Sequence, residues 1–91
     1  MKEQTIQANI LKYLESIGAY SVKIISASRK GVPDITGCLP GGRFFAIEVK
    51  LGNAKATPLQ QYNIDLIHSA GGIAFVANNV NTVKEKLKCG Y

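Results

Sequence analysis

Cysteine is scarce in this sequence, and its two copies, Cys38 and Cys89, stand far apart. Neither belongs to a CxxC pair or to a Cys/His cluster, so the usual ligand spacing of a zinc site is missing. Isolated thiols of this kind are typical of a protein in a reducing compartment, where they remain free. We therefore expect neither a disulfide nor a zinc ion to support the fold.

Long apolar runs are also missing. No stretch approaches the roughly 20 apolar residues that cross a membrane as a helix. The first ten residues, MKEQTIQANI, begin a helical pattern instead of the charged and apolar regions of a secretory signal. We therefore expect a soluble, intracellular protein with no membrane partner.

Acidic residues are few, with 6 Asp and Glu against 11 Lys and Arg and a formal net charge of +5. This balance favours a polyanionic partner, most simply nucleic acid. The alternative is a soluble protein that is basic without such a partner. Because every carboxylate opposes the binding of an anion, acids on inward faces need a separate explanation.

Hydrophobic periodicity and turn residues predict seven elements in the order αβββαβα within a single domain, residues 1–91. The predicted elements are a helix at 4–17, strands at 20–26, 34–39 and 43–50, a helix from the N-cap Thr57 to Ala70, a strand at 73–78, and a short helix capped by Asn81 or Thr82 that ends near Lys88. The strands at 34–39 and 43–50 form a predicted hairpin, and the strand–helix–strand unit that follows predicts parallel neighbours. The fold class is therefore α/β, a central mixed β-sheet flanked by helices.

Two ionisable residues end the otherwise apolar strand RFFAIEVK at 43–50. Strand alternation puts Glu48 and Lys50 on one face, about 7 Å apart. Both faces of this strand begin apolar, so we expect it to be central and its end to be partly desolvated. An ionised group there costs several kcal/mol unless it is paired or bound to a metal. The alternative is a strand end that emerges into water.

Three further residues can meet at this strand end. Asp34 begins the partner strand and can lie beside Glu48, where two carboxylates repel each other unless a divalent cation separates them. Hard oxygen ligands favour Mg²⁺ or Mn²⁺. Glu3 and Gln60 each lie on the predicted sheet-facing side of a helix.

Each of these three residues also has a simpler interpretation. Asp34 can be a turn residue after proline, and Glu3 can make a favourable charge–dipole contact at a helix N-terminus. Gln60 can complete a capping box that begins at Thr57. The residue pattern leaves these alternatives open.

Three short motifs together resemble a known family: GVPD at 31–34, EVK at 48–50 and TPLQ at 57–60. They resemble the virus-type replication-repair nuclease (VRR-Nuc) domain, a branch of the PD-(D/E)xK nuclease superfamily. The resemblance covers nearly the whole chain, from the helix with Glu3 to the strand at 73–78. It implies a restriction-endonuclease-like fold and a deoxyribonuclease that depends on Mg²⁺ or Mn²⁺.

The resemblance also implies roles for individual residues. Asp34 and Glu48 are implied as metal ligands, with the Val49 backbone carbonyl and Glu3 as further ligands. The catalytic residues are implied to be those two carboxylates together with Lys50 and Gln60.

The family further implies a homodimer that cuts branched DNA, such as a Holliday junction or a flap, in the cytoplasm of a bacterial or phage-infected cell. We predict that the nucleic-acid backbone is contacted by Arg29, Lys30, Arg43 and Lys55. Three lysines of the last helix are further candidates for such contacts, but we favour the alternative that they are solvated surface charges: Lys84, Lys86 and Lys88. The alternative functions are a non-catalytic nucleic-acid-binding module with the same fold, and an RNA-processing enzyme.

Overall fold

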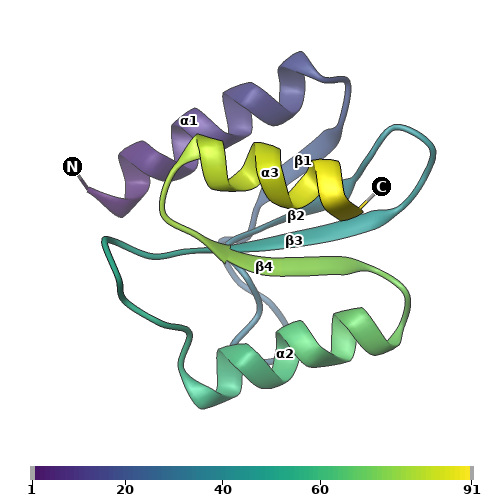
Figure 1. Cartoon of the computed structure of the whole chain (residues 1–91). Helices are drawn as coiled ribbons and strands as arrows, with labels where there is room; N and C mark the ends of the chain where they lie inside the picture. The colour runs from purple at the N-terminus through teal and green to yellow at the C-terminus, as the bar shows by residue number, and fades with distance from the viewer. Residues whose placement is uncertain (1, 91) are drawn as a thin grey trace.

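A mixed four-stranded sheet carries helices on both faces in the computed structural model, which describes residues 2–90 (Figure 1). The elements are α1 (Glu3–Ser16), β1 (Tyr20–Lys23), β2 (Ile35–Cys38), β3 (Phe44–Val49), α2 (Pro58–Ser69), β4 (Ile73–Ala77) and α3 (Val80–Gly90). Helices α1 and α3 cover one face of the sheet, and α2 covers the other (Figure 1). The structure confirms the predicted α/β class and the order αβββαβα.

The strands are ordered β1-β2-β3-β4 across the sheet. The pairs β1–β2 and β2–β3 are antiparallel, and Ile35 lies opposite Ile47 in the second pair. Strand β4 pairs with β3 in parallel, with Val76 opposite Glu48. The predicted hairpin and the parallel crossover through α2 are therefore both confirmed.

Strand alternation sorts the side chains of β3 into two layers of the core. Phe45, Ile47 and Val49 pack in the larger cluster with α1 and α3, whereas Ala46 belongs to the smaller cluster beneath α2. Glu48 follows the alternation onto the α2 side of the sheet. The site carboxylate thus lies over the smaller of the two apolar layers.

Strand β1 is shorter than predicted, because it ends at Lys23 instead of residue 26. Its partner β2 begins only at Ile35. The N–H of Ile24 donates a hydrogen bond to the Asp34 carbonyl at 2.8 Å. Ile25 is then 84% exposed, so its apolar character does not indicate a strand. A strand continues only while a neighbouring strand supplies hydrogen bonds.

The predicted cap of the last helix was wrong by two or three residues. Helix α3 begins at Val80, and the Asn79 side chain accepts a hydrogen bond from the Thr82 N–H at 2.8 Å. Asn79 therefore does the capping that the sequence analysis assigned to Asn81 or Thr82.

Cys38 is a free, half-buried thiol in β2. The side chain of Cys89 lies outside the part of the chain that the structure describes. No helix between residues 2 and 90 has the length and apolarity that would span a bilayer.

Candidate active site

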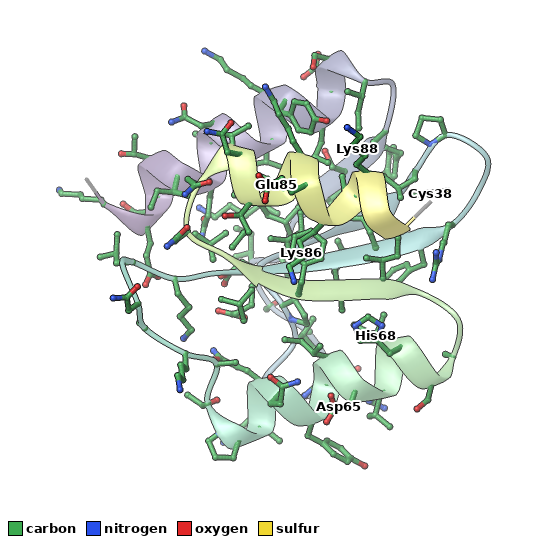
Figure 2. The ribbon with its side chains drawn as sticks, in the orientation of Figure 1. Cys38, Asp65, His68, Glu85, Lys86 and Lys88 are labelled. Atoms are coloured by element: carbon green, nitrogen blue, oxygen red, sulfur yellow. The ribbon has the colours of Figure 1, made fainter. Side chains whose placement is uncertain are left out.

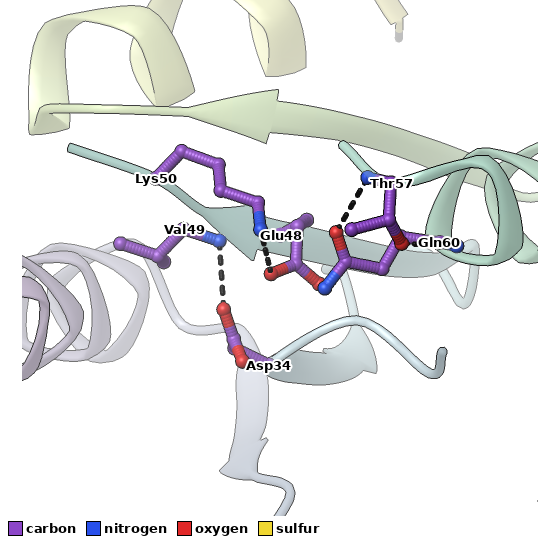
Figure 3. A network of polar contacts seen from close by, with 6 residues as sticks. All are labelled: Asp34, Glu48, Val49, Lys50, Thr57 and Gln60. Atoms are coloured by element: carbon purple, nitrogen blue, oxygen red, sulfur yellow. Dashed lines mark hydrogen bonds and ion pairs between the residues drawn. The ribbon is translucent and has the colours of Figure 1, made fainter. Parts of the chain in front are cut away.

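Asp34 stands immediately before β2, and the strand register places it opposite Glu48. Its Oδ2 accepts a hydrogen bond from the Val49 N–H at 2.9 Å (Figure 3). The N–H and C=O of one strand residue point to the same side of the strand. The Val49 carbonyl therefore also lies on the side where Asp34 is held.

The loop before Asp34 is fastened to α2. Gly31 has φ +81°, and a Cβ added there would lie 2.8 Å from Leu59 Cγ and 2.9 Å from the Leu59 carbonyl oxygen. The Asn63 side chain donates from Nδ2 to the carbonyls of Lys30 at 3.1 Å and Leu59 at 2.9 Å. These contacts hold the loop against α2, so that Asp34 lies at the end of β3.

Asn63 was not singled out in the sequence analysis. The available signal was a polar residue next to Ile64 on the buried side of a helix. Sequence alone does not name its partners, because Lys30 is 33 positions away.

Glu48 is only 3% exposed, and its Oε1 atom is buried without a hydrogen-bond partner. Its Oε2 atom lies 3.8 Å from Lys50 Nζ, a loose ion pair (Figure 3). The pKa of the Glu48 carboxyl is raised from 4.5 to about 8, mainly by burial, then by the neighbouring Asp34, and least by the charge of Glu3. Lys50 lowers this pKa, but by less than burial raises it. Without a cation, the site therefore favours a protonated Glu48.

Glu3 lies in the first turn of α1 and is half-buried. Helix α1 begins near the end of the sheet where β3 and β4 finish (Figure 1). Its charge contributes to the raised pKa of Glu48, which places it within electrostatic reach. However, residues 2–90 contain no group of three or more His, Cys, Asp or Glu side chains arranged to hold a metal. Glu3 therefore does not form a three-carboxylate cluster with Asp34 and Glu48 in this structure.

Gln60 takes part in the capping box of α2. Its Oε1 accepts a hydrogen bond from the Thr57 N–H at 2.9 Å, and its own N–H donates to Thr57 Oγ1 at 3.2 Å. The capping interpretation is therefore confirmed. The nitrogen end of the same side chain is directed toward the Glu48 carboxyl (Figure 3). Capping leaves this amide group available to the site, and its catalytic role stays a prediction.

The donor atoms at this strand end fit a divalent cation. Two carboxylates, from Asp34 and Glu48, lie together with the Val49 carbonyl on the adjoining side of the strand. The unpartnered Oε1 of Glu48 needs a donor or a cation, because a buried acceptor without either is costly. Hard oxygen donors of this kind suit Mg²⁺ or Mn²⁺.

Two of the predicted DNA-contacting residues line a groove of about 420 Å³ beside the loop that leads to Asp34. We call it the basic groove, and its lining residues are Arg29, Lys30, Leu59, Tyr62, Asn63 and Leu66. It combines two cationic side chains with an exposed aromatic ring, and it has no acidic lining residue.

The other two predicted contacts lie apart from each other. Lys55 lines a hollow of about 480 Å³ that also contains Val76, the residue opposite Glu48 in the sheet. Arg43 precedes β3 and donates from Nε to the Gly71 carbonyl at 3.1 Å. It is about 17 Å along the strand from Glu48, so the structure brings Lys55 toward the site but not Arg43.

The lysines of α3 and the histidine of α2 lie in other parts of the fold. Lys84 Nζ lies 5.3 Å from the centroid of the Tyr13 ring, and Lys86 and Lys88 extend from α3 (Figure 2). His68 lies between α2 and β4, with Nε2 at 2.7 Å from the Ala74 carbonyl (Figure 2). Since α3 covers the face opposite α2, these lysines extend from the other side of the sheet than Glu48.

A sequence profile of the VRR-NUC domain matches residues 2–81. The chain belongs to the VRR-NUC family. The chain is also 33% identical over 60 residues to the protein named "Putative nuclease p44" of Acyrthosiphon pisum secondary endosymbiont phage 1. That match covers 66% of this chain and 64% of the phage protein.

Two solved VRR-NUC structures share the fold. One is 27% identical with a TM-score of 0.83, and it covers 98% of this chain and 97% of its own. The other is 20% identical with a TM-score of 0.77, and it covers 98% of this chain and 87% of its own. The family and the phage relative support the predicted nuclease function.

Proposed function

We propose that this VRR-NUC domain is a metal-dependent endonuclease that hydrolyses phosphodiester bonds in branched DNA, such as a Holliday junction or a flap. One observation carries the proposal. Glu48 is a buried carboxylate with an unpartnered oxygen, and it lies beside Asp34 and Lys50 in the fold of a nuclease family. A non-catalytic binding module would gain nothing from this costly arrangement.

The residues divide the chemistry among them. A divalent cation, when bound, neutralises phosphate charge and lowers the pKa of a coordinated water. Asp34, Glu48 and the Val49 carbonyl would hold it, and the Val49 N–H keeps the Asp34 carboxylate in position. Lys50 can orient the attacking water, accept its proton, or stabilise charge on the phosphate.

Other features support the proposed DNA substrate and the proposed homodimer. The basic groove and Lys55 lie on the side of the molecule that carries the site, and the net charge of +5 favours a polyanion. A homodimer suits a small core and two symmetric cuts across a junction. A dimer mass by light scattering at assay concentration supports this assembly, whereas a monomer mass counts against it.

The proposed activity is tested with branched, flapped, duplex and single-stranded DNA in the presence of Mg²⁺ or Mn²⁺. We expect cleavage of a branched substrate by the wild type. Even outer-shell partners of a metal site contribute 10- to 100-fold, so Glu48→Ala should lose at least about 100-fold. Lys50→Ala should also lose about 100-fold or more, because it removes a group that acts on the reacting atoms.

Other outcomes of the same assay point elsewhere. Binding without metal-dependent cleavage on every substrate would identify a non-catalytic module. Cleavage that persists in both variants would mean a contaminant or a different site. Faster cleavage of RNA versions of these substrates would identify an RNA-processing enzyme.

The basic groove is tested by salt dependence. The double variant Arg29→Gln/Lys30→Gln should bind DNA more weakly on every sequence. The slope of log affinity against log salt should become shallower by up to about 1.8, since each phosphate contact on duplex contributes about 0.9. A matched control, Lys86→Gln/Lys88→Gln, removes two charges from α3, on the opposite side of the sheet. Equal losses of DNA affinity in the two double variants would show that binding depends only on the net charge of the protein.

A further inference from the structure

Gln7 is a buried amide on α1 that the proposed mechanism does not use. It is 7% exposed, and its Oε1 atom has no hydrogen-bond partner. Another buried amide, Asn63, instead donates two hydrogen bonds to backbone carbonyls. An unpaired buried polar atom is unfavourable and uncommon, so the one in Gln7 needs an explanation.

Among the side chains that the structure describes, two buried polar atoms lack a partner: Gln7 Oε1 and Glu48 Oε1. Both are oxygen acceptors. One belongs to the proposed cation site. A cation, or the O–H of a water bound to it, would be the partner that such acceptors lack.

The fold places Gln7 at the same end of the sheet as that site. Glu3, four residues earlier, is close enough for its charge to raise the pKa of Glu48. Residues four apart on a helix lie on one face, with Cβ atoms about 5–6 Å apart. The start of α1 lies where β3 ends (Figure 1), and α1 packs on the face of β3 that carries Val49. Gln7 is thus one turn behind Glu3 on the buried side of α1.

We propose that Gln7 supplies a neutral oxygen acceptor to the cation site, bonding either to the cation or to a water bound to it. This inference rests on the proposed function. A neutral acceptor suits the position, because Asp34 and Glu3 already oppose the ionisation of Glu48. A further carboxylate would add repulsion, whereas an amide adds a ligand without charge. Magnesium retains several waters in protein sites, which leaves room for such a group.

The test compares Gln7→Met with the wild type in the absence of DNA. Methionine keeps the length of the side chain and removes the amide. We expect the metal-free variant to melt at or above the wild-type temperature, because the unpaired oxygen is gone. We expect its Mn²⁺ affinity, measured by calorimetry, to fall 10- to 100-fold, the usual effect of losing an outer-shell partner. Gln4→Met, on the exposed side of the same helix, should change neither quantity.

Three outcomes would overturn the inference. Unchanged Mn²⁺ affinity in Gln7→Met would show that the amide does not serve the site. A melting temperature several degrees below the wild type, again with unchanged affinity, would show a structural role. If Gln7→Met does not fold, Gln7→Leu replaces it, and the loss of the amide should lower the Mn²⁺ affinity in the same way; equal binding would reject the inference.

The same measurement separates this inference from the proposed function. A Glu48→Gln variant should lose Mn²⁺ binding if the cation site exists. If the wild type binds no Mn²⁺, or if Glu48→Gln binds it equally well, both the proposed cation site and the inference about Gln7 are rejected. If Glu48→Gln loses binding and Gln7→Met does not, only the inference falls.

Discussion

At pH 8 and without divalent cations, Glu48→Gln should unfold at a higher temperature than the wild type. Burial and the neighbouring Asp34 raise the pKa of Glu48 from 4.5 to about 8, so between these values the native state holds a proton that the unfolded state has lost. The free energy of unfolding of the wild type therefore falls as pH rises through this interval and levels off above it. Each pKa unit corresponds to about 1.4 kcal/mol, so the expected rise in melting temperature at pH 8 is on the order of 20 °C.

The check is a set of thermal melts from pH 4 to pH 9 in the presence of a chelator. The stability difference between Glu48→Gln and the wild type should be smallest near pH 4 and grow until about pH 8. Glu85→Gln, at an exposed position on α3, serves as the control, because it removes a carboxylate that is not buried. Parallel melting curves for Glu48→Gln and the wild type at all pH values would contradict the expectation.

The stabilised variant should also be an inactive one. Glutamine keeps the shape of Glu48 but removes the charge that a divalent cation needs, so cleavage should fall at least about 100-fold. For the wild type, added Mn²⁺ should restore stability most strongly near pH 8, where the cation competes with the fewest protons. A gain in stability together with a loss of activity is typical of a residue retained for function.

Gly31→Ala should produce the second large effect. Alanine at φ +81° is strained by about 1–2 kcal/mol. Its Cβ would also lie within 2.9 Å of the Leu59 carbonyl oxygen and of Asn63 Nδ2. We expect a loss of at least about 2 kcal/mol, which lowers the melting temperature by about 8 °C or more. Metal-dependent cleavage should fall further than the loss of folded protein explains, because Asp34 follows three residues later.

Gly41→Ala is the matched control for this substitution. Gly41 has φ +97°, but no atom lies within 4 Å of an added Cβ. It lies in the turn between β2 and β3, at the end of the sheet away from Asp34. It should therefore show the backbone strain alone, with cleavage retained in the folded fraction. Equal losses of activity in both variants would mean that the contact of Gly31 with α2 does not position the site.

Local pattern was sufficient for the element order, the hairpin and the capping box of α2. Period-two alternation already put Glu48 and Lys50 on one face, and the short turn at residues 40–42 sets a register in which Asp34 faces Glu48. These features depend on neighbours within a few residues, and so they can be read from a single sequence. The family motifs rest on the same local positions.

Features that depend on residues far apart in the sequence cannot be predicted from local pattern. The end of β1 depends on where β2 begins, and the anchoring of the Gly31 loop depends on Asn63 in α2. The raised pKa of Glu48 and the unpaired oxygen of Gln7 depend on burial by several elements at once. Hydrogen bonding and desolvation are set by atoms that only packing brings together. The spacing of Glu48 and Lys50 can therefore be read from the sequence. The electrostatic cost that makes Glu48 a candidate cation ligand arises only in the folded sheet, because burial by several elements creates it.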